Sequence, residues 1–127
     1  DRLALSGIVL NAVGRGEKGP AMRRFRPGDR VTYQLEIYNA RRSAAGQAPN
    51  LEGKIQIFRD GRLVSTPDAG AISEIPWNSE RLVMTGELTL GPDMPPADYV
   101  LQVTVTDKLA PQHRSAASQW IDFEIVP

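Results

Sequence analysis

The sequence predicts an all-β domain, namely an immunoglobulin-like antiparallel β-sandwich of about seven strands in two sheets. Apolar and polar residues alternate with a period of two along several segments, and turn-forming residues separate those segments. The 10 prolines and 11 glycines lie mostly between the alternating runs, where they suit β connections and disfavour long helices. The 127 residues match the size of one domain, so residues 1–127 are expected to form a single sandwich.

Alternation is clearest in four segments. Between Arg30 and Asn39, four apolar residues share one parity, which a strand collects on one face and a helix would scatter around its axis. The same pattern predicts three more strands. The residues predicted to face the core in these four segments are Val31, Tyr33, Leu35 and Ile37; Leu82, Met84, Leu88 and Leu90; Tyr99, Leu101, Val103 and Val105; and Ile121, Phe123 and Ile125.

Three further strands are predicted from shorter runs. The segment from Leu3 to Leu10 has apolar residues of both parities and is expected to contain a bulge around Gly7. The runs Lys54 to Arg59 and Arg62 to Ser65 flank the dipeptide Asp60-Gly61. This dipeptide favours a two-residue hairpin turn, because both central residues of that turn need a positive φ.

About seven alternating strands in one open sheet would leave an apolar face in water, whereas two sheets facing each other bury it. Tyr99 adds a topological indication, because it begins the sixth strand directly after a proline-rich turn and Asp98. Immunoglobulin-like sandwiches carry a corner tyrosine at this place, with its hydroxyl bonded to nearby backbone. A plain core tyrosine is the alternative interpretation.

The composition excludes several classes of function. Lys+Arg and Asp+Glu both number 15, so the net charge of zero argues against a general nucleic-acid binder or a binder of anionic membranes. There is no cysteine, which excludes disulfides, thiolate metal sites and cysteine nucleophiles. No apolar run approaches the roughly 18 residues of a membrane span, so no membrane insertion is expected.

Six segments carry a resemblance to a known family. They are FRPGD at 25–29, YQLEIYN at 33–39, IFRDG at 57–61, GELTL at 86–90, DYVLQVTVTD at 98–107 and SQWIDF at 118–123. Together they resemble the C-terminal β-sandwich region of bacterial, acidobacterial-type von Willebrand factor A-related (VWFA-related) exported proteins, in which this region follows an A-type domain.

The resemblance implies an extracytoplasmic location, secreted or periplasmic, and a role in adhesion, scaffolding or ligand recognition. The implied partner is a protein, either the N-terminal A-type domain of the same chain or another exported protein. The start at Asp1 also suggests a piece of a longer protein. The Asp-x-Ser-x-Ser metal motif of A-type domains occurs nowhere in this sequence, so this region is not expected to be the metal-bearing one.

Residues suited to catalysis or metal binding are few. His113 is the only histidine and lies in a Pro-Gln-His-Arg segment with no serine in a nucleophile-elbow motif, so no enzyme activity is predicted. The aspartates lie in or beside predicted turns, where Asp bonds nearby backbone; a convergence of these loops on calcium is the alternative. No cofactor is predicted. The aspartates concerned are Asp29, Asp60, Asp68, Asp93, Asp98 and Asp107.

Three apolar residues have the parity of the outer face. Phe58, Val100 and Trp120 are predicted to point away from the core, on strands that an immunoglobulin-like topology makes neighbours in one sheet. They would form an exposed patch of a kind that monomers usually avoid. Covering of these groups by loops or a bulge is the alternative. Trp77 is a candidate loop aromatic or a plug over an open end of the sandwich.

These residues leave several functions open. A protein-interaction or scaffolding module would use the Phe58, Val100 and Trp120 face or an edge strand. A carbohydrate-binding module would stack Trp77 and Trp120 on sugar rings, and an aromatic platform ringed by polar groups would favour it. An enzyme would need a buried polar cleft with shifted carboxylates. A pure spacer is the remaining alternative.

Overall fold

The computed structural model describes residues 3–13, 23–40, 49–75, 78–110 and 116–127, and these contain ten strands and no helix. The described connections at 26–29, 60–61 and 91–96 are rich in Gly, Pro and Asp, the residues that favour turns. The strands are β1 (Ala4–Leu5), β2 (Val9–Ala12), β3 (Arg24–Phe25), β4 (Arg30–Tyr38), β5 (Leu51–Arg59), β6 (Arg62–Ser65), β7 (Ala71–Ile75), β8 (Asn78–Thr89), β9 (Ala97–Asp107) and β10 (Ala116–Ile125).

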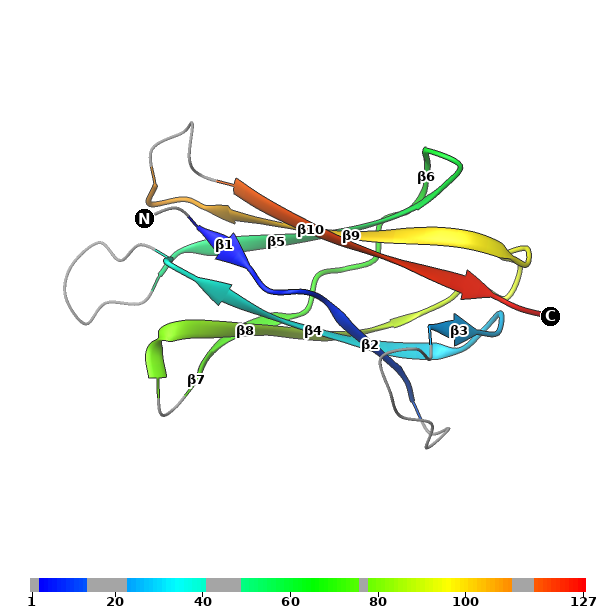
Figure 1. Cartoon of the computed structure of the whole chain (residues 1–127), viewed down its shortest axis with the longest axis horizontal. Coiled ribbons are helices and arrows are strands. Elements are labelled where there is room, and N and C mark those ends of the chain that lie inside the picture. The colour runs from blue at the N-terminus through cyan, green and yellow to red at the C-terminus, as the bar shows by residue number, and fades with distance from the viewer. Residues whose placement is uncertain (1–2, 14–22, 41–48, 76–77, 111–115) are drawn as a thin grey trace.

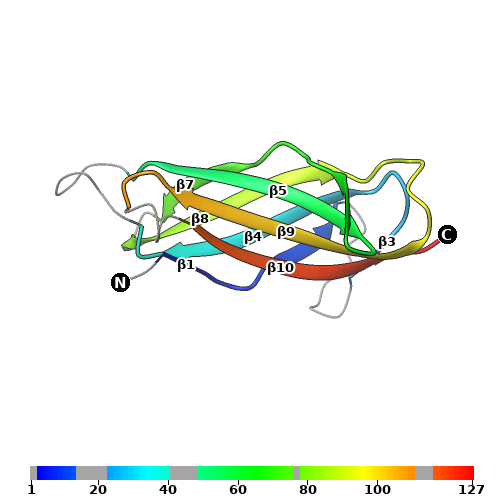
Figure 2. The same cartoon turned by 90° about the horizontal axis from the view of Figure 1, so that it is seen from above.

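The strands form two sheets packed face to face. One sheet, which we call sheet A, has the order β1-β4-β8-β7, with β2 also paired to β4. The other, sheet B, has the order β3-β10-β9-β5-β6. Figure 1 shows β4 and β8 in the lower layer and β5 and β9 in the upper one, and Figure 2 shows β5, β9 and β10 side by side. This distribution of strands is that of an immunoglobulin-like sandwich.

Pairing is antiparallel everywhere in the described sheets except between β3 and β10, which run parallel. The predicted first strand is broken into β1 and β2 around Gly7, where an irregularity was expected. The prediction of about seven strands was low because this first strand is split in two and because the prediction missed β3 and β7. β3 has only two residues, and in β7, an edge strand, Ile72 packs against the core only partly buried.

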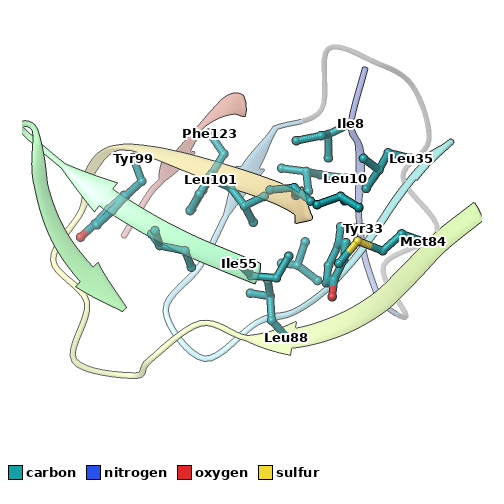
Figure 3. Packing of buried hydrophobic residues seen from close by; sticks show 14 of the residues in the cluster. Ile8, Leu10, Tyr33, Leu35, Ile55, Met84, Leu88, Tyr99, Leu101 and Phe123 are labelled. Carbon is teal, nitrogen blue, oxygen red and sulfur yellow. The ribbon is translucent and has the colours of Figure 1, made fainter. Parts of the chain in front are cut away.

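The core lies between the sheets and consists of the residues that the alternation assigns to the inner faces. Figure 3 shows Leu35, Leu88, Leu101 and Phe123 converging from both sheets, and each is at most 5% exposed. Ile121, also predicted to face inward, is only partly buried. Ile55 and Ile57 of β5 are buried as well. The remaining predicted core residues are also buried: Val31, Tyr33, Ile37, Leu82, Met84, Leu90, Tyr99, Val103, Val105 and Ile125.

The turns have the backbone geometry that their residues predict. Asp60 and Gly61 both have positive φ, 51° and 76°, and join β5 to β6 in a hairpin. Gly28 follows Pro27 with φ 85°, in the place where a type II turn needs a positive φ. The Asp29 carboxylate accepts a hydrogen bond of 2.9 Å from the Arg26 N–H across the same turn, so this aspartate has the backbone-bonding role expected of it.

Tyr99 is a corner tyrosine. Its ring is 2% exposed, and its hydroxyl donates a 2.7 Å hydrogen bond to the carbonyl of Pro95, four residues upstream. The bond ties the proline-rich turn to the start of β9. This geometry is the corner motif of immunoglobulin-like sandwiches, and it confirms the prediction made from the position of Tyr99 in the sequence.

Tyr99→Phe is expected to lower the free energy of unfolding by about 1 kcal/mol, because it removes one hydrogen bond and keeps the packing of the ring. Urea unfolding measures the change. Tyr38→Phe is the matched control, since its hydroxyl bonds the Glu36 side chain on a half-exposed part of the surface, and we expect a smaller loss there. Equal unfolding midpoints for the wild type and Tyr99→Phe would contradict a stabilising effect of the hydrogen bond between Tyr99 and Pro95.

Candidate interaction surface

The outer face of sheet B carries apolar residues on adjacent strands. Phe58 of β5 lies directly opposite Val100 of β9, and Trp120 of β10 lies opposite Gln102, two residues further along β9. Trp120 therefore stands diagonal to Val100, at a separation that an aromatic side chain bridges. Val100 is 37% exposed, Trp120 is 63% exposed and Phe58 is partly buried. The structure thus brings the three predicted residues onto one face.

Leu63 extends this surface and was missing from the predicted set. It lies on β6 directly opposite Phe58 and is 49% exposed. The sequence does carry a signal for it, because a two-residue hairpin turn at Asp60-Gly61 pairs Arg59 with Arg62 and so places Leu63 beside Phe58. Leu63, Phe58, Val100 and Trp120 are called the outer patch below.

Polar side chains surround the outer patch. Asp122 lies opposite Val100 on β10 and forms a 2.8 Å ion pair with Arg23. On the other side, Thr104 and Ser118 share a 3.0 Å hydrogen bond. An apolar centre with a polar margin is the usual anatomy of a protein-binding surface.

Two of the pockets formed by described residues lie outside the outer patch. A mostly apolar one of about 340 Å³ lies between β6 and the turn before β9, with Val64, Met94 and Tyr99 among its lining residues. A smaller one of about 180 Å³ is lined mainly by charged groups, including the paired Arg23 and Asp122. The ion pair of Arg23 with Asp122 links the residue before β3 to β10, so these two charges stabilise the contact between the two strands.

The sequence singles out further candidate groups in addition to the outer patch. Trp77 and His113 fall outside the described residues. Within the part of the chain that the structure describes, no three His, Cys, Asp or Glu side chains gather closely enough to hold a metal ion. Burial raises the pKa of the Tyr33 phenol, an effect that the hydrogen bond from the Gly70 N–H partly offsets, but this group lies in the core.

The chain matches no protein-family model, and neither curated proteins nor solved structures give a significant match. No helix long and apolar enough to cross a membrane occurs among the described residues. The geometry by itself defines a class of protein: a β-sandwich that presents an apolar patch on the outer face of one sheet.

Proposed function

We propose that this chain is a non-catalytic protein-interaction or scaffolding module that binds another protein through the outer patch. The observation that supports this most is the exposure of Trp120, at 63%, on the outer face of sheet B. Binding of a partner that covers this large aromatic side chain would remove its apolar surface from water, which is favourable. Trp is also among the residues that contribute most binding energy at protein interfaces.

The setting of the module is proposed from the sequence resemblance. We infer that it belongs to an exported VWFA-related bacterial protein, works outside the cytoplasm and docks on the A-type domain of the same protein. A net charge of zero suits this role, because such docking then depends on apolar contact more than on long-range attraction. No cofactor is required for it.

Trp120→Ser tests the proposal against the purified A-type domain in a titration by calorimetry. The variant is expected to weaken binding by at least about tenfold, since exposed aromatic anchors at interfaces typically contribute 1–2 kcal/mol or more. Val9→Ser is the matched control: Val9 is an apolar residue, 55% exposed, on β2 of the other sheet, and its loss should leave binding unchanged.

Both variants should keep the far-UV circular dichroism and unfolding midpoint of the wild type, because both side chains are exposed. Unchanged affinity in Trp120→Ser would contradict docking through the outer patch. No measurable binding of the wild type to the A-type domain would contradict that choice of partner.

A carbohydrate-binding module is the second candidate. It is favoured by the cross-strand pairing of the exposed Trp120 with Gln102, since an indole face beside an amide group suits a sugar ring. Trp77, the other aromatic of that hypothesis, lies outside the described residues. A glycan panel separates the two candidates: binding of a glycan that Trp120→Ser abolishes, without affinity for the A-type domain, favours this one.

A further inference from the structure

One margin of sheet B is only partly paired. β10 pairs with β9 along its whole length, but on its other side β3 contacts it only at Glu124 and Ile125. The N–H groups of Glu124 and Val126 donate to the carbonyls of Arg23 and Phe25, each at 2.8 Å. Figure 2 shows β10 as the outermost of the long strands of this sheet.

The unpaired part of this margin can be identified from the alternation of the backbone. Because alternate residues direct their N–H and C=O groups to the same side, Trp120, Ser118 and Ala116 point theirs away from β9, as Glu124 does. The Asp122 carbonyl already has a partner, because it accepts a 3.1 Å hydrogen bond from the Arg23 guanidinium. Among the described strands, none pairs with Ala116, Ser118 or Trp120 on this side. These three residues are called the β10 edge.

The β10 edge carries none of the sequence features by which proteins usually protect such a margin. The segment 116–121 reads AASQWI and contains no charged residue, proline or glycine. Edge strands are normally blunted by charges, prolines or bulges, because their free backbone groups are a template for another strand. The opposite margin of sheet B follows this rule, since β6 begins with Arg62 and has an irregular register against β5.

We infer that the β10 edge pairs with the β10 edge of a second copy of this chain, antiparallel and centred on Ser118. In this register Ser118 lies opposite its own copy, and the large Trp120 lies opposite the small Ala116 of the other chain. No charged side chain meets a like charge between Ala116 and Trp120. Such an interface is isologous, the arrangement of most homodimers.

A register centred on another residue pairs fewer of the three residues of the β10 edge. Centring the pairing on Trp120 would place Ala116 opposite Glu124 of the second copy, where β3 already occupies the backbone. The register centred on Ser118 is therefore the one that pairs all three free residues. It joins the two copies of sheet B into one continuous sheet and places both outer patches on the same face.

Sedimentation equilibrium of the wild-type chain over a concentration series up to about 1 mM tests this inference. The expected mass rises towards twice the 13.9 kDa of one chain. Ser118→Pro is expected to stay monomeric, because it removes an N–H directed at the second copy and leaves the ladder to β9 intact. A single-chain mass for the wild type at every concentration would overturn the inference.

A pair of charge variants provides the matched control. Ser118→Glu and Thr104→Glu both lose the Thr104–Ser118 hydrogen bond and both add one negative charge to the outer face. Only Ser118→Glu places two like charges opposite each other in the dimer, so we expect it to be monomeric and Thr104→Glu to dimerise. A dimer that persists in Ser118→Pro and Ser118→Glu but is lost in Val100→Ser forms through the outer patch and overturns the pairing.

Failure here is distinguishable from failure of the proposed function. Ala116→Pro removes another N–H of the β10 edge and changes no residue of the outer patch or of its polar margin, so it should stay monomeric and bind the A-type domain as the wild type does. Loss of the dimer with retained binding supports the edge pairing separately from docking. A dimer mass that no edge variant changes rejects the pairing. The docking proposal is then still tested separately, by the calorimetric titration of Trp120→Ser.

Discussion

Phe123→Ala is expected to lower the free energy of unfolding by about 3–5 kcal/mol, the largest effect predicted for this chain. Phe123 is 4% exposed and lies between two other aromatic rings. Its ring stacks on Tyr99 with centroids 5.6 Å apart and meets Phe25 edge-on at 6.0 Å. Truncation removes both contacts and leaves a cavity between the sheets, which the surrounding strands can fill only partly.

Trp120→Ala is the control for this prediction, because it removes a larger aromatic side chain from the same strand. Trp120 has the opposite parity to Phe123 and is 63% exposed, so we expect a loss below about 1 kcal/mol. Equilibrium unfolding in guanidinium chloride measures both variants. Equal losses would contradict the assignment of the two residues to opposite faces of sheet B.

The second large effect is expected for Gly86→Ala, with a loss of about 3 kcal/mol. A Cβ at Gly86 would lie 2.3 Å from the Tyr33 hydroxyl oxygen and 2.5 Å from its Cζ, which is closer than atoms can approach. Tyr33 lies opposite Gly86 in the sheet and cannot turn aside freely. Its ring is 1% exposed, and its hydroxyl accepts a hydrogen bond from the Gly70 N–H.

Two variants isolate this steric cause. Gly7→Ala adds the same methyl group where no atom lies within 4 Å and φ is not positive, so its stability should stay within about 1 kcal/mol of the wild type. Tyr33→Val makes room beside Gly86, and the double variant Tyr33→Val/Gly86→Ala should be more stable than the sum of the two single losses predicts. Strict additivity in thermal or chemical unfolding would contradict a clash with Tyr33.

The outer patch could be predicted in part from the sequence. The parity of Phe58, Val100 and Trp120 is a local property, and it places each side chain on the outer face once the strand itself is recognised. Their mutual positions are not local. The diagonal offset of Trp120 from Val100 depends on the register between β9 and β10, which the intervening turn does not determine by length alone.

The position of Leu63, in contrast, depends only on residues close to it in the sequence. Its place beside Phe58 follows from the short hairpin at Asp60-Gly61, so sequence reasoning was sufficient in principle. The ion pair of Arg23 with Asp122 was beyond that reasoning, because the two residues are 99 positions apart and meet only through the parallel pairing of β3 with β10. A two-residue strand has no periodicity by which it could be found.

The sequence by itself determined which side chains face inward, because the direction of successive side chains alternates along any extended backbone. It also determined the positive-φ hairpin at Asp60-Gly61 and the corner position of Tyr99, since both depend on nearby residues. Only the tertiary structure decided that β3 covers just one end of β10. Pairing between strands distant in the chain is set by the closure of the two sheets around a shared core, and that closure left the β10 edge without a partner strand among the described residues.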